Sequence, residues 1–168
     1  MSLIKRYCSF VPKILFSLLR NGYSRADYLR KHPVLNRIGE NVYFYSRIYP
    51  ADAKLLRLGN NVVIATNVRF LGHDRVDIML SGMMQERYYK FYDCIDVGNN
   101  VFIGSDCTIL PGVKIGDNSI IGAGAIVTKD LPSGGIWDGI PAKQIGNFDD
   151  FIAKRMKLIK PESDPDEL

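Results

Sequence analysis

The sequence predicts a mainly β fold built from a six-residue repeat, and two regularities in residues 97–131 support this prediction. Aliphatic residues return at every sixth position, at Val97, Ile103, Ile109, Ile115, Ile121 and Val127. Four positions after each of them stands a second, mostly small or apolar residue: Val101, Cys107, Val113, Ser119, Ala125 and Leu131. An α-helix would spread a period of six around its circumference, and an ordinary strand would alternate at every second residue. Each unit is therefore expected to supply a short strand and a corner, with both recurring residues facing inward.

Turn-forming residues mark the corners. Glycine follows the aliphatic residue in four units, at Gly98, Gly104, Gly116 and Gly122, and an Asn-Asn or Asp-Asn pair follows two of these glycines. Both residue types adopt the backbone conformations that tight turns need.

This pattern resembles that of the hexapeptide-repeat acyltransferases, and the resemblance covers residues 38–145. It implies a single-stranded left-handed parallel β-helix with three hexapeptides in each triangular coil. The inward residues would then stack three repeats apart, as Val97 with Ile115, Ile103 with Ile121, and Ile109 with Val127. A repeat scaffold alone does not specify a reaction.

Residues 1–36 are expected to form an N-terminal helical segment. Apolar side chains at helical spacing between residues 4 and 19 predict an amphipathic helix that is kinked or restarted at Pro12. It is expected to cap the open end of the repeat, and a basic helix lying on a membrane is the alternative. A second helix is expected to begin with Ser24 as N-cap and to end before Pro33. Because Pro12 and Lys13 interrupt the apolar run, neither export nor membrane insertion is expected.

The β-helix is expected over residues 37–146. The six-residue repeat is interrupted at residues 50–57, and the number of residues between Phe70 and Val97 is not a multiple of six. Residues 77–93, rich in Met, Tyr and Phe with Gly82 as a hinge, are therefore expected to form an excursion loop. Residues 147–168 are expected to form a C-terminal helix that begins at Asp149 or Asp150, followed by an acidic tail.

Composition excludes several classes of protein. A net charge of +4 on 168 residues is too small to indicate a nucleic-acid partner. The three cysteines form no CxxC pair and no disulfide framework, which suits the cytoplasm, and Cys107 is expected in the core. The γ-class carbonic anhydrases share the implied fold but hold zinc with three histidines, whereas this chain has two. We therefore predict no catalytic metal.

His73 is the candidate catalytic residue, because it stands where the chain is expected to leave the repeat. An imidazole suits a general base at neutral pH, although from the residues alone a structural role is equally open. The resemblance favours catalysis, since His73 matches in order and context the catalytic histidine of hexapeptide O-acetyltransferases. Asp74 is expected to form a turn or to face solvent, because adjacent residues on extended backbone rarely face one another. His32 is expected to have no chemical role.

The resemblance also implies a site for acetyl-CoA. Residues 121–130 and the Pro-Ala-Lys motif at 141–143 resemble the coenzyme A half of galactoside and maltose acetyltransferases. The matching cofactor positions are Ser105, Ala123, Gly124, Thr128, Lys129, Pro141 and Lys143. The small residues would let a pantetheine arm lie along the wall, and the lysines would meet the phosphates.

Two positions depart from the family pattern. Gly146 replaces a basic residue found in some relatives, and Trp137 stands where a small aliphatic residue is common. Trp137 would either stack on the cofactor or fill the subunit interface, and the sequence leaves both interpretations open.

The resemblance implies an acetyl-CoA-dependent O-acetyltransferase of polysaccharide biosynthesis that acts on a sugar hydroxyl, with His73 as base and direct attack on the thioester. Relatives are trimers with the site between subunits, so a homotrimer with a saccharide acceptor is expected. The alternatives are N-acetylation of an amino sugar, acetylation of an antibiotic, and a non-catalytic β-helix that serves as an assembly module. The excursion would determine the acceptor, and its aromatic residues Tyr88, Tyr89, Phe91 and Tyr92 suit either a sugar ring or loop packing.

Overall fold

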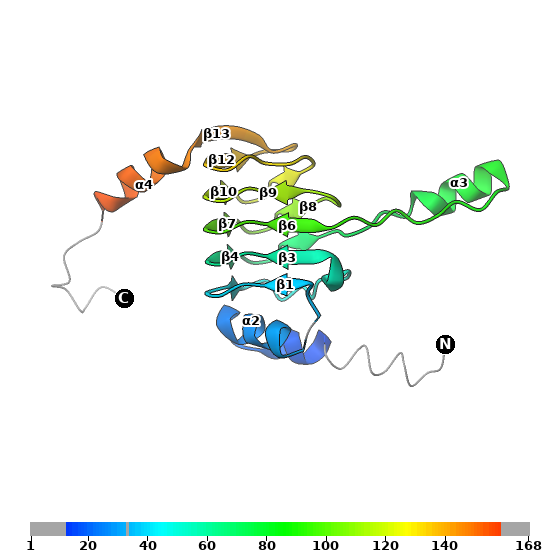
Figure 1. Ribbon diagram of the computed structural model, residues 1–168, viewed down its shortest axis with the longest axis horizontal. Coiled ribbons are helices and arrows are strands. Elements are labelled where there is room, and N and C mark those ends of the chain that lie inside the picture. Colours follow the sequence, from blue (N-terminus) through cyan, green and yellow to red (C-terminus); the bar gives the residue numbers. More distant parts are fainter. Residues whose placement is uncertain (1–12, 33, 159–168) are drawn as a thin grey trace.

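The computed structural model describes residues 13–32 and 34–158, and its centre is a column of short stacked strands arranged in three sheets (Figure 1). The first sheet contains β1 (Arg37–Ile38), β3 (Leu56–Leu58), β6 (Ile95–Val97) and β9 (Lys114–Ile115). The second contains β2 (Tyr43–Phe44), β4 (Val62–Ile64), β7 (Val101–Ile103), β10 (Ser119–Ile121), β12 (Gly135–Asp138) and β13 (Lys143–Asn147). The third contains β5 (Arg69–Phe70), β8 (Thr108–Ile109) and β11 (Ile126–Val127). Neighbouring strands are parallel except β12 and β13, so the described chain forms a parallel β-helix.

The strand register confirms the predicted stacking of the repeats. The stacked pairs are Val97 with Ile115, Ile103 with Ile121, and Ile109 with Val127. These six side chains are at most 2% exposed, and burial of each stabilises the fold by about 1.5–3 kcal/mol. The smaller residues four positions later are buried too. Among them the Cys107 thiol donates to the Gly122 carbonyl at 3.0 Å, and burial raises the pKa of this thiol, which confirms its place in the core.

A ladder of asparagines forms one corner of the column. Its members are Asn41, Asn61, Asn100 and Asn118, with φ between 51° and 55°. Asparagine tolerates this left-handed conformation better than most residues. The side-chain amides of Asn41, Asn61 and Asn100 each donate to the next asparagine of the ladder at 2.8–2.9 Å, so the three bonds join successive coils.

Helix α2 (Gly22–Lys31) and the helical residues 13–18 close the N-terminal end of the column (Figure 1). The prediction of Ser24 as N-cap is wrong, because the Asn21 side chain accepts a hydrogen bond from the Ser24 N–H at 2.8 Å. A Cβ atom on Gly22 would lie 2.9 Å from the Tyr43 ring, so this glycine lets the first turn pack closely against the second sheet. The part of the predicted first helix that precedes residue 13 lies outside the described residues.

Arg25 joins α2 to the first coil. Its side chain is fully buried and donates to the carbonyls of Phe44 at 2.8 Å and Tyr45 at 2.9 Å, and also to the Leu19 carbonyl. Phe16 packs edge-on against Phe44 in the same region, with 5.7 Å between the ring centroids. The cap therefore combines apolar packing with a buried guanidinium that satisfies backbone acceptors.

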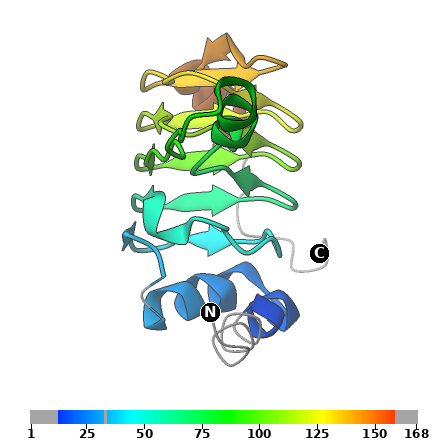
Figure 2. The same ribbon diagram turned by 90° about the vertical axis from the view of Figure 1, so that its right-hand side faces the viewer.

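Residues 71–94 leave the column between β5 and β6 and form an arm that projects from it (Figures 1 and 2). The arm carries helix α3 (Val76–Met84), in which no residue is buried. The excursion expected as a loop therefore contains a helix, and Gly82 lies inside that helix rather than at a hinge. At the base of the arm, His73 and Tyr92 form an antiparallel bridge, and the Asp93 N–H donates to the Gly72 carbonyl at 3.0 Å.

Strands β12 and β13 close the C-terminal end, and α4 (Phe148–Met156) follows them (Figure 1). The predicted start at Asp149 or Asp150 is wrong by one or two residues, because the helix begins at Phe148 and Asn147 accepts from the Asp149 N–H at 2.8 Å. Within the described ranges, no helix combines the length and hydrophobicity that a bilayer crossing requires.

Candidate active site

His73 lies three residues after β5, at the corner between the third and first sheets and at the base of the arm. Its side chain is 26% exposed, and its Nδ1 atom pairs with Oδ2 of Asp52, whose side chain is 18% exposed. A carboxylate at Nδ1 holds the proton on that nitrogen, so Nε2 keeps a free lone pair. This arrangement leaves Nε2 able to act as a general base.

Asp52 is the functional candidate that the sequence analysis missed. It belongs to residues 50–57, which interrupt the repeat, and its carbonyl accepts from the Leu55 N–H at 2.8 Å at the start of the short 3-10 helix η1 (Ala53–Leu55). Gly72 allows the close approach, since a Cβ atom there would lie 2.7 Å from Cβ of Asp52. The available signals were the interruption itself and a glycine immediately before the histidine.

The neighbouring Asp74 has a local role. Its Oδ1 atom accepts from the Val76 N–H at 3.2 Å, just before α3 begins. This bond confirms the prediction of a turn-forming aspartate. Asp74 is therefore a convenient comparison for Asp52, since the two carboxylates flank the same site and differ in their contacts.

Tyr92 lies beside the imidazole on the returning chain of the arm. The centroids of the Tyr92 and His73 rings are 5.6 Å apart with an interplanar angle of 48°. Lys90 places its Nζ atom 4.5 Å from the Tyr92 ring centroid, within the range of a cation–π contact. At the base of the arm, an aromatic ring therefore lies beside His73 and a cation lies beside that ring.

Three of the predicted cofactor residues share the corner between the second and third sheets. Ser105 lies in the turn before β8, and Ala123 and Gly124 lie in the equivalent turn before β11. The Gly124 N–H donates to the Ser105 carbonyl at 2.7 Å, which stacks the two turns. Gly124 has φ +78°, and a Cβ atom there would meet no atom within 4 Å, so this corner is open to a ligand.

Thr128 and Lys129 occupy the other edge of the third sheet, at the same corner as His73 but after β11 rather than β5. Two strand spacings separate these levels, a distance of roughly 10 Å. Pro141 lies on the exposed connection from β12 to β13, and Lys143 is the exposed first residue of β13. The connection packs on β11 through the hydrogen bond from the Ala142 N–H to the Ile126 carbonyl at 2.9 Å. The predicted site residues therefore lie around the third sheet, with His73 at the end of that sheet formed by β5.

Trp137 lies on β12 in the second sheet. It is in register with Ile121 at the end of the inward column, and its ring packs against the core. Its Nε1 atom is buried and has no hydrogen-bond partner among the described residues. In the single chain Trp137 covers the C-terminal end of the core.

Comparison with known proteins agrees with this geometry. The family described as bacterial transferase hexapeptide (six repeats) matches residues 95–129. The protein CapG of Staphylococcus aureus is 35% identical over 151 residues, which cover 86% of this chain and 83% of CapG. This chain belongs to the bacterial hexapeptide-repeat transferases.

Other members of the hexapeptide-repeat family are similar as well. Galactoside O-acetyltransferase of Escherichia coli (strain K12) is 42% identical over 116 residues, or 67% of this chain and 54% of that protein. The chain thus spans about half the length of several curated relatives that it matches. The solved structure of a galactoside acetyltransferase in complex with coenzyme A superposes with a TM-score of 0.65 at 27% identity, covering 89% of this chain and 83% of that one.

Proposed function

We propose that this hexapeptide-repeat protein transfers an acetyl group from acetyl-CoA to a hydroxyl of a saccharide, with His73 as the general base. The observation that carries the proposal is the His73–Asp52 pair at the edge of the third sheet. Further support comes from relatives named galactoside O-acetyltransferase and from a similar solved structure that contains coenzyme A.

In the proposed reaction, Nε2 of His73 takes the proton of the acceptor hydroxyl while the oxygen attacks the thioester carbonyl. The carbon–sulfur bond then breaks, and the imidazolium returns the proton to the departing thiolate. Asp52 keeps the imidazole in the required tautomer and stabilises its charged form. A positioned base of this kind contributes about 10²–10⁴-fold to the rate.

We propose that acetyl-CoA lies along the edges of the third sheet. Ser105, Ala123 and Gly124 would form the wall for the pantetheine arm, because this corner is open and presents backbone groups. The cofactor's phosphates would meet Lys129 and Lys143, beside Thr128 and Pro141. The exposed positions of the two lysines, away from the buried core, support this role.

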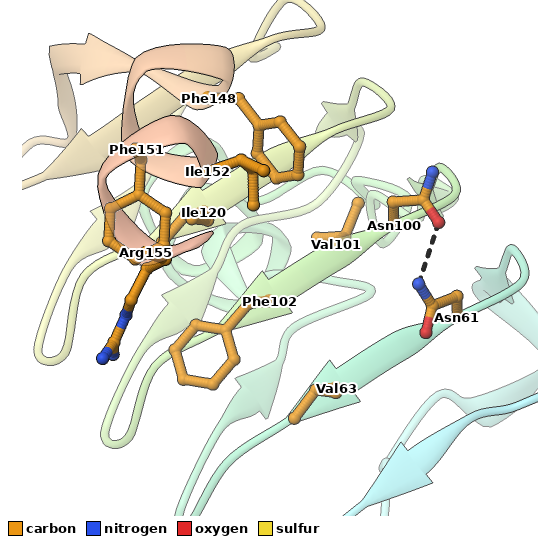
Figure 3. Close-up of a pocket in the computed structure, with 10 residues that line it drawn as sticks. All are labelled: Asn61, Val63, Asn100, Val101, Phe102, Ile120, Phe148, Phe151, Ile152 and Arg155. Atoms are coloured by element: carbon orange, nitrogen blue, oxygen red, sulfur yellow. Dashed lines mark hydrogen bonds between the residues drawn. The ribbon is translucent and has the colours of Figure 1, made fainter. Parts of the chain in front are cut away.

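We also propose a left-handed winding and a homotrimer, both of which follow from the family. The trimer is supported by apolar side chains that point outward from the second sheet. Val63, Phe102 and Ile120 face Phe148 and Ile152 of α4 across an open groove (Figure 3). Phe102 is 43% exposed, and a second chain would bury it. A trimer would have three times the chain mass of 18.9 kDa in light-scattering measurements.

The proposal is tested by following free thiol release from acetyl-CoA with purified protein and a panel of saccharides, amino sugars included. Wild type should turn over with at least one hydroxyl acceptor, and His73→Ala should lose about a hundredfold or more. His32→Ala is the matched control, since His32 packs on Tyr28 in the cap and should be dispensable for turnover. Equal rates for wild type and His73→Ala would remove His73 from the mechanism. Failure to bind acetyl-CoA would instead favour a non-catalytic module.

A further inference from the structure

A cavity of about 400 Å³ adjoins the His73–Asp52 pair. Its lining includes Val34, Tyr49, Asp52, Lys54, Leu55 and Tyr92. Two of these residues also contact the imidazole, because Asp52 pairs with Nδ1 of His73 and the Tyr92 ring lies beside it. A ligand in the cavity is therefore separated from the catalytic candidate by only one side chain.

The walls of the cavity suit a sugar ring. Tyr49 and Tyr92 supply aromatic side chains, and Val34 and Leu55 supply aliphatic surface. A volume of this size lies within the range of small-molecule sites, which are mainly apolar with a few polar groups that fix orientation.

Three lysines lie in the lining of the cavity or beside its two tyrosines. Lys54 belongs to the lining, Lys90 lies 4.5 Å from the Tyr92 ring centroid, and Lys13 lies 5.8 Å from that of Tyr49. None of the ion pairs formed among residues 13–32 and 34–158 includes these three lysines. Asp52 is the only acidic residue among the described residues that line the cavity, and it already pairs with His73. Three ammonium groups without carboxylate partners attract an anion.

We infer that the acceptor is an anionic saccharide, whose carboxylate or phosphate lies in the cavity formed by Tyr49, Lys54 and Tyr92 while a hydroxyl reaches His73. This inference rests on the proposed acetyl transfer and specifies its substrate class. Lysine binds either anion as a point charge, so the cavity chemistry is the same for a uronic acid and for a sugar phosphate.

The test compares three glucosides that differ in one group: a neutral methyl glucoside, the matching methyl glucuronide, and a methyl glucoside phosphate. Binding of each to the purified protein is measured by calorimetry, and acetyl transfer is measured alongside. Each exposed lysine contact is worth about twofold to fivefold in affinity, so at least one anionic sugar should bind about tenfold more tightly than the neutral one. The anionic sugar that binds more tightly identifies the carboxylate or the phosphate as the preferred group.

The double variant Lys54→Gln/Lys90→Gln should reduce this anionic preference to less than about threefold. Lys114→Gln, which removes an exposed lysine from the first sheet, is the matched control and should retain the wild-type preference. Raising the salt from about 0.05 M to about 0.5 M should weaken the preference in wild type. Equal binding of neutral and anionic sugars, or a preference that survives the double variant, would overturn the inference. Acetyl transfer to a neutral sugar in that case would leave the proposed function standing.

Discussion

Replacement of Asp52 by asparagine tests whether the negative charge of Asp52, rather than its shape alone, supports catalysis by His73. Asparagine has nearly the same shape as aspartate, so the turn at residues 50–57 and the contact with Gly72 should persist. The amide can still face Nδ1, but it no longer carries the negative charge that stabilises the imidazolium and favours one tautomer. The variant should therefore fold normally and lose activity.

The size of the loss follows from the exposure of the pair. The two side chains are 26% and 18% exposed, so water partly screens the interaction and the effect should be smaller than for a fully buried pair. We expect kcat to fall by about ten- to a hundredfold, or about 1.4–2.7 kcal/mol of transition-state stabilisation. The KM for acetyl-CoA should change little, because Asp52 lies away from the proposed cofactor wall.

The assay is steady-state thiol release by wild type, Asp52→Asn and Asp74→Asn. Asp74→Asn is the control, because asparagine can still accept the hydrogen bond from the Val76 N–H. Thermal unfolding of the three proteins checks that they are equally stable. Wild-type kcat in Asp52→Asn, or an equal loss in Asp74→Asn, would refute the role assigned to Asp52.

Two further variants test the cofactor wall and the cap. The double variant Lys129→Gln/Lys143→Gln should raise the KM for acetyl-CoA about tenfold in steady-state kinetics with little change in kcat, because each lysine adds a charge contact to a phosphate. An unchanged KM would contradict the proposed position of the cofactor. Arg25→Met should lower the free energy of unfolding in urea by about 2 kcal/mol or more, since it removes the donor to the buried Phe44 carbonyl and to two part-buried carbonyls. The exposed Arg30→Met should cost about 1 kcal/mol or less. Equal losses for the two arginines would show that the buried bonds of Arg25 do not hold the cap.

The column could be predicted because its period is strict. Residues such as Ile103 and Ile121 recur without a slip, and once three repeats form a coil, strand register and burial follow. The cap positions were less predictable, because Asn21 and Ser24 can both serve as N-cap. Packing decides between them, since Gly22 is the residue that fits against the Tyr43 ring.

The candidate site was predicted only in part. His73 could be found from its place at the end of the repeat, but its partner Asp52 lies in a segment without periodicity. The contact between His73 and Asp52 depends on the turn of the chain at η1 and on the absence of a side chain at Gly72. Neither feature produces a periodic pattern in the sequence. The cavity beside Tyr92 has the same origin, because it forms only where that segment meets the base of the arm.

A crystal structure of the protein soaked with coenzyme A would test most directly whether His73 and the third sheet form one site. The account predicts that the cofactor follows the corner of Ser105 and Gly124, with its thiol within a direct or one-water contact of His73 Nε2. Coenzyme A bound elsewhere, with its thiol remote from every His73 in the assembly, would contradict it.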